Sequence, residues 1–144
     1  MIGMRIDQAR GLFFDRAAVT SAADRAQRRV LSRFGAFVRR GARSSIRKRK
    51  TISQPGSPPS SHTGLLKNNI FFVYEPLRSS VIIGPILLSG KGTDAPALLE
   101  HGGHAVGRRR KKRVRLTYRP RPFMGPAFER ETPKLPAMWR DSVR

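Results

Sequence analysis

The sequence predicts an α+β fold, in which a long N-terminal helix and a C-terminal helix pack on a small antiparallel β-sheet of about three or four strands. Three observations lead to this prediction. Apolar residues recur at helical spacing in the first 40 positions, β-branched and aromatic residues gather in the middle, and a proline-rich segment precedes a last apolar stripe. A chain of 144 residues suits one domain with one hydrophobic core.

The first helix is predicted by apolar residues that lie three and four positions apart. These residues are Val19, Ala23, Ala26, Val30, Phe34, Phe37 and Val38. Either Thr20 or Ser21 can cap the start of the helix. We expect Val30, Phe34 and Phe37 to pack on the sheet. The arginines of the other face are either solvated or in contact with DNA or an acidic protein.

A basic run follows this helix, which we expect to end between Gly41 and Ser45. The run consists of Arg47, Lys48, Arg49 and Lys50. Its positive charge suits the negative end of the helix dipole. A linker comes next, because Ser53–Ser61 contains three prolines, one glycine and four serines. The linker connects the helix to the sheet.

The middle of the chain has the composition of β-strands. Asn69–Tyr74 is aromatic and β-branched, and Ser80–Leu88 is a second such run, so the short link between them predicts an antiparallel hairpin. Val114–Tyr118 alternates apolar and polar residues and predicts a third strand. Between these strands, Asp94 can cap a short helix that continues to Leu99.

These segments together predict a single domain over residues 1–144. Its parts are a basic helical segment at 1–50, a Pro/Ser-rich linker at 51–63, a sheet at 64–119 with a basic loop at 105–113, and a proline strap with a C-terminal helix at 120–144.

The charge of the chain points to an anionic partner. Thirty Lys and Arg against nine Asp and Glu give a net charge of +21. Residues 1–50 carry +11, residues 51–100 are neutral, and residues 101–144 carry +10. Such a charge repels itself unless nucleic acid or an acidic protein surface offsets it. We expect no membrane partner, because no apolar run approaches the roughly 18 residues of a spanning helix.

The basic loop is the most concentrated of the charged segments. It contains Arg108, Arg109, Arg110, Lys111, Lys112 and Arg113, and glycines precede it. Three interpretations stay open: a solvated tip, contact with phosphates, or docking on an acidic protein. No base-reading motif accompanies the loop, so contact with DNA would be nonspecific.

Residues suited to catalysis are scarce. The chain has no cysteine, which excludes disulfides, thiolate chemistry and cysteine-based zinc sites. His62 lies in the linker, and His101 and His104 have too few other ligands beside them for a metal site. Gly90–Thr93 (GKGT) lacks the spacing of a phosphate-binding loop. We therefore expect no catalytic residue, no metal and no cofactor, and the protein is not expected to be an enzyme.

A proline strap at Pro120–Phe128 (PRPFMGPAF) is the most informative stretch. Pro120 and Pro122 favour a rigid, extended backbone before the helix, and Pro126 suits a first helical position. The strap would hold Phe123 and Met124 as an anchor, either into the core of the domain or into a neighbouring subunit.

Glu100 lies beside Gly102 and Gly103. We expect it to pair with an arginine of the same or an adjacent subunit, as a positioning contact and not as an acid or base.

Four segments of the chain match a known pattern in the same order. The matching residues are Thr63, Gly64, Leu65 and Ile70, then Ile83 and Gly84, then Glu100 and Gly102, then Pro122, Phe123, Pro126 and Ala127. This pattern resembles that of the tail-completion, or head-tail joining, proteins in the neck of long-tailed bacteriophages. The resemblance covers roughly residues 57–142. The chain departs from this pattern at Gly103, where many members of the family carry Thr. A basic insert then follows Gly103.

The resemblance implies a structural virion protein. A ring of six or twelve copies would join head and tail around a channel that DNA crosses, with neighbouring connector and tail proteins as partners, after assembly in the host cytoplasm. Glu100 and the strap residues Pro122, Phe123, Met124 and Pro126 would form the subunit interface. Arginines of the first helix and the basic loop would line the channel or bind an acidic neighbour. The alternative is a nonspecific nucleic-acid-binding protein, which the charge favours.

Overall fold

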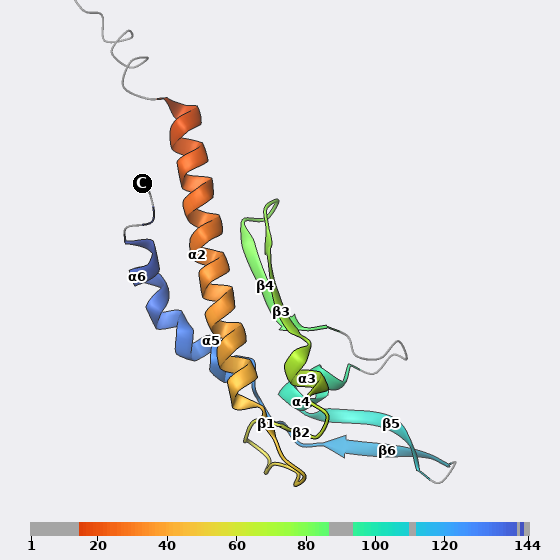
Figure 1. The fold of residues 1–144 in the computed structure, drawn as a ribbon. Coiled ribbons are helices and arrows are strands. Elements are labelled where there is room, and N and C mark those ends of the chain that lie inside the picture. The colour runs from red at the N-terminus through yellow and green to blue at the C-terminus, as the bar shows by residue number, and fades with distance from the viewer. Residues whose placement is uncertain (1–14, 87–93, 110–111, 141, 143–144) are drawn as a thin grey trace, which may run out of the picture.

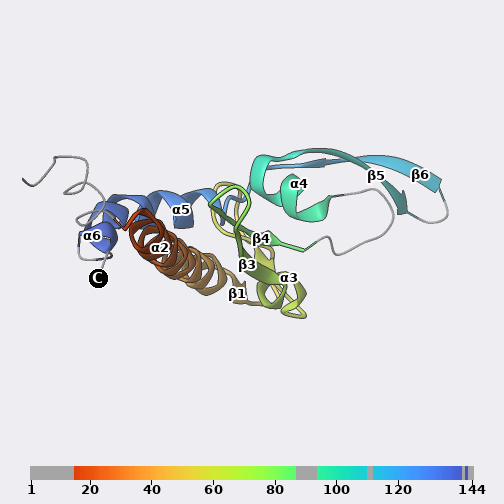
Figure 2. The same ribbon diagram turned by 90° about the horizontal axis from the view of Figure 1, so that it is seen from above.

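The computed structural model describes residues 15–86, 94–109, 112–140 and 142. A long helix, α2, forms the centre of the fold, with a β-hairpin along one side and two short helices along the other (Figure 1). A second hairpin extends away from this body, as the view from above shows (Figure 2). The mixed α+β class with a long N-terminal helix is therefore confirmed.

The elements follow one another along the chain with these bounds. They are α2 (Arg16–Ser45), β1 (Arg47–Lys48), β2 (Ser60–Ser61), α3 (Leu65–Asn68), β3 (Ile70–Glu75), β4 (Ser80–Pro85), α4 (Ala95–His101), β5 (Gly103–Arg109), β6 (Lys112–Tyr118), α5 (Gly125–Glu131), the 3-10 turn η1 (Thr132–Lys134) and α6 (Leu135–Trp139).

Helix α2 begins earlier than expected. The side chain of Asp15 accepts a hydrogen bond of 3.0 Å from the amide of Ala18 and caps the helix. Thr20 and Ser21 lie inside the first turns, so the cap predicted there is wrong. The helix ends at Ser45 as expected, because Ile46 adopts an extended conformation. The basic run after it is not a tail of the helix but enters the two-residue strand β1.

The core lies along one stripe of α2. Its buried residues are Phe34, Val38, Ala42, Ile46, Leu66, Ile70, Phe123 and Ala127. Val30 and Phe34 are buried as predicted, but Val19 is 58% exposed because the start of α2 extends beyond the core. Phe37 is only half-buried, and the guanidinium groups of Arg33 and Arg40 lie over its ring at 5.6 and 5.0 Å.

The hairpin β3–β4 is confirmed as antiparallel. Its register pairs Val73 with Ile82, and both face away from α2 and are more than half exposed. The inner face touches the helix closely: a Cβ added at Gly35 of α2 would come within 2.8 Å of Val81 and 2.9 Å of Phe72.

The predicted sheet of three or four strands is wrong for the described residues. They form three separate two-stranded sheets: β3–β4 and β5–β6 are antiparallel, and β1–β2 is a parallel pair two residues long. Strand β6 pairs with β5, which occupies most of the predicted basic loop 105–113. The sequence of β5 (GHAVGRR) did not predict a strand, because its two glycines and two arginines have low strand propensity. Pairing with β6 stabilises it as a strand.

The other predicted elements are close to those observed. Asp94 caps α4 by accepting a 3.2 Å hydrogen bond from Ala97, and the helix continues to His101 rather than Leu99. The C-terminal helix is two short helices joined by η1, and Pro126 is the second residue of α5 rather than the first. Of the two adjacent leucines, Leu66 is buried and the family-matched Leu65 is 54% exposed.

The linker is docked on the proline strap. The amide of Gly56 donates a 2.9 Å hydrogen bond to the carbonyl of Pro120, and the side chain of Arg121 donates one of 3.0 Å to the carbonyl of Ser53. Two segments more than 60 positions apart are thereby held together.

Some predictions fall outside the described residues. They concern Leu87 and Leu88 at the end of the second strand, the GKGT sequence at Gly90–Thr93, and Arg110 and Lys111. Among the helices that the structure describes, none has the length and apolar character needed to cross a membrane.

Candidate functional site

Glu100 of α4 clamps the strap to the rest of the chain. One carboxylate oxygen accepts hydrogen bonds from the amides of Phe123 and Met124, at 2.8 and 3.0 Å, and the other accepts one of 2.7 Å from Gly125. These amides lie at the start of α5, where backbone donors lack partners within the helix. The carboxylate therefore satisfies three donors and places negative charge at the positive end of the helix dipole.

This contact corrects the prediction for Glu100. It is a positioning contact, as expected, but its partners are backbone amides, and no arginine forms an ion pair with it in the described part of the chain. Gly102 makes the approach possible, because its φ of +75° is a left-handed conformation and a Cβ there would meet Pro120 and the carbonyl of Tyr118 at 3.0 Å.

The predicted anchor Phe123 is buried, as expected, with a side chain that is 1% exposed. It belongs to the core of its own chain, so it offers no surface to a neighbouring subunit in this conformation. Met124 packs partly against the same core, and Pro122 is half-buried. Of the four predicted interface residues in the strap, only Pro126 is exposed.

The basic hairpin β5–β6 places like charges in register. Its backbone pairs Arg108 with Arg113 and Arg109 with Lys112. Basic residues opposite one another lower the stability of a hairpin, unless an anion offsets their repulsion. Lys112, Arg113 and Arg115 are exposed.

A pocket of about 640 Å³ lies where α2 ends, between the linker and α5. We call it the arginine pocket, because Arg47, Arg49 and Arg130 line it together with five serines. The structure thus brings two members of the predicted basic run together with a third arginine. Lys48 and Lys50 of the same run are exposed but do not line the described pocket.

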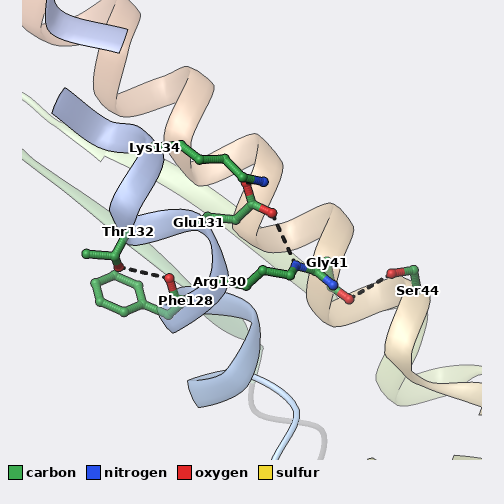
Figure 3. Close-up of polar contacts among 7 residues, drawn as sticks. All are labelled: Gly41, Ser44, Phe128, Arg130, Glu131, Thr132 and Lys134. Carbon is green, nitrogen blue, oxygen red and sulfur yellow. Dashed lines mark hydrogen bonds and ion pairs between the residues drawn. The ribbon is translucent and has the colours of Figure 1, made fainter. Parts of the chain in front are cut away.

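Arg130 owes its position to two neighbours (Figure 3). Its Nε lies 3.3 Å from the carboxylate of Glu131, and its guanidinium rests against Gly41 of α2, where a side chain would collide with it. Glu131 is buried and also accepts a 2.8 Å hydrogen bond from Lys134. That hydrogen bond, and then the charge of Lys134 and the contact with Arg130, lower the pKa of Glu131, although burial opposes them.

Sequence reasoning missed Arg130, Glu131 and Ser53. Arg130 lies more than 80 positions from Arg47 and Arg49 along the chain, and nothing in its neighbourhood marks it as their partner. The one available signal was Gly41, since a glycine inside a helix pattern often has a packing reason.

The three histidines do not assemble a metal site. Within the described residues, no group of three or more His, Cys, Asp or Glu is placed to hold a metal ion. His104 instead lies 3.1 Å from the hydroxyl of Thr117 across the β5–β6 hairpin.

No protein-family model, no curated protein and no solved structure matches this chain.

Proposed function

We propose that this chain is a structural protein of a phage neck, which forms a ring that joins head and tail around a DNA channel. In this proposal it works in the virion after assembly in the host cytoplasm, beside connector and tail proteins, and it is not an enzyme. The observation that carries the proposal is the contact of Glu100 with the start of α5. It links the third and fourth of the four family-like segments.

These two segments lie more than 20 positions apart, and the pattern alone says nothing of why both are needed. Glu100 supplies the acceptor, Gly102 provides the turn, and Phe123 with Pro126 supplies the buried anchor and the rigid helix start. One physical unit that uses the matched residues of both segments supports a shared ancestry better than scattered matches do.

Exposed apolar side chains on both hairpins support contacts between copies in this proposal. The outer face of β3–β4 carries Phe71, Val73 and Ile82, which are 45 to 59% exposed. Val106 on β5 is 68% exposed. A two-stranded sheet with one open apolar face gains stability when another surface covers it. These residues replace Phe123 as the proposed contacts between subunits.

The proposal is tested by the mass of the purified protein in native mass spectrometry. We expect a closed ring of six or twelve copies, and we expect Val73→Lys with Ile82→Lys to dissociate it. Val19→Lys is the control, because it places a lysine on an exposed apolar position of α2 outside both hairpins. A monomer at every concentration tested would overturn the ring. If that monomer also binds DNA tightly, the alternative of a nonspecific nucleic-acid-binding protein takes its place.

A further inference from the structure

We propose that the arginine pocket binds phosphate groups of a nucleic-acid backbone through Arg47, Arg49 and Arg130. The inference deepens the proposed function, which supplies the source of the phosphate as DNA in the channel. The pocket is separate from the basic hairpin, and Arg130 has no place in the basic runs of the sequence.

The charges around the pocket are one-sided. Three guanidinium groups line it, and no Asp or Glu is among its described lining residues. Within the described part of the chain, neither Arg47 nor Arg49 has a carboxylate within ion-pair distance. Like charges that converge on one hollow repel each other, so a bound anion stabilises the arrangement.

Arg130 keeps donors available at its terminal end. Glu131 engages its Nε, and neither Nη group donates a hydrogen bond within the described residues, although one of them lies against Gly41. Glu131 pairs with both Arg130 and Lys134, so this group of two cations and one carboxylate keeps a net positive charge. A planar guanidinium fork fixed in this way matches the oxygens of a phosphate.

One residue of the pocket wall holds a buried hydroxyl without a partner. Ser53 lines the pocket, and its Oγ is buried without a hydrogen-bond partner among the described residues. Buried hydroxyls are normally hydrogen-bonded. The carbonyl of Ser53 accepts a hydrogen bond from Arg121, which holds this part of the wall in place.

The charges beside the pocket favour nucleic acid over an acidic protein. Lys48 and Lys50 are exposed and adjoin the pocket residues Arg47 and Arg49 along the chain. They can bind neighbouring phosphates of a linear polyanion. Each neutralised phosphate releases counterions and adds to the affinity.

The test is the affinity of the full chain for a fluorescein-labelled DNA duplex, measured by anisotropy over a range of salt concentrations. We expect Arg49→Gln and Arg130→Gln each to weaken binding about tenfold, through loss of charge-assisted hydrogen bonds. The salt slope should fall by about one unit for each. Lys48→Gln is the matched control, since it removes one charge of the same run outside the pocket, and we expect about a twofold loss.

A second variant moves Arg130 without removing its charge. Gly41→Ala places a methyl group against the guanidinium, and we expect it to lower the affinity for DNA by less than Arg130→Gln does, because the charge is kept. Equal losses for Lys48→Gln and the pocket variants would overturn the pocket as a phosphate site. So would a polyglutamate peptide that binds the pocket more tightly than the duplex does.

Failure of this inference and failure of the proposed function are distinguishable. Native mass spectrometry of the same variants reports the ring. If the protein forms a ring and the pocket variants bind DNA as the control does, only the phosphate site in the pocket is contradicted. Loss of DNA binding in pocket variants of a protein that never forms a ring contradicts only the neck function.

Discussion

The guanidinium of Arg130 in α5 lies against Gly41 of α2 (Figure 3). Because Gly41 has no side chain, the guanidinium can lie directly on the surface of α2. The neighbouring carbonyl of Gly41 accepts a 2.9 Å hydrogen bond from Ser44, which keeps the last turn of the helix closed. Gly41 and Gly35 thus serve different faces of the same helix.

Alanine substitutions at Gly35 and Gly41 should have different effects on the free energy of unfolding. Gly35→Ala should lower the free energy of unfolding by about 1 to 3 kcal/mol, because its methyl group meets the packed side chains of Val81 and Phe72. Gly41→Ala should leave it within about 1 kcal/mol of wild type, because the end of an arginine can move. Chemical denaturation measures both. Each variant gains the same helix propensity, so a similar loss in both would contradict the assigned contacts.

Glu100→Gln should destabilise the chain by about 1 to 3 kcal/mol, because an amide group replaces one of the two oxygens that accept from the start of α5. Unfolding by denaturant measures the change. Glu129→Gln on the exposed face of α5 is the control, with an expected change within about 0.5 kcal/mol. Equal effects of the two substitutions would show that the clamp adds no stability.

Phe123→Ala should lower the free energy of unfolding by about 3 to 5 kcal/mol, because the side chain is 1% exposed in the core. Leu77→Ala, at a position 97% exposed in the β3–β4 turn, should change it by less than about 0.5 kcal/mol. Thermal unfolding and native mass spectrometry of the same samples separate folding from assembly. A ring that is lost while the melting temperature stays unchanged would restore Phe123 as a contact between subunits.

Glu131 should make stability depend on acidic pH. Its pKa is lowered in the folded chain, so its ionised form contributes stability above the unfolded-state pKa of about 4.5, and the contribution disappears as pH falls through the folded-state pKa. The difference in unfolding free energy between wild type and Glu131→Gln should therefore be largest near neutral pH and shrink below about pH 4. Denaturant titrations at several pH values measure it. A difference that stays constant over this range would mean that Lys134 and Arg130 do not stabilise the carboxylate.

Local sequence was enough for the elements whose pattern lies within one segment. Helical spacing predicted the buried stripe of α2 at Val30 and Phe34, because helical periodicity is a property of neighbouring positions, although Phe37 of the predicted face is only half-buried. The hairpin β3–β4 followed from two β-rich runs with a short link. The prolines around Phe123 marked it as a fixed anchor, and its burial confirmed that much.

The tertiary structure decided everything that depends on which distant segments meet. The strand β5 exists through its pairing with β6, although its own sequence is that of a basic loop. Glu100 binds backbone amides rather than an arginine, and no local pattern says which carboxylate will reach a given helix start. Arg130 joined Arg47 and Arg49 only through the packing of α5 on α2. Contacts between residues far apart are set by the packing of whole elements, and the order of residues along the chain does not encode them in any local pattern.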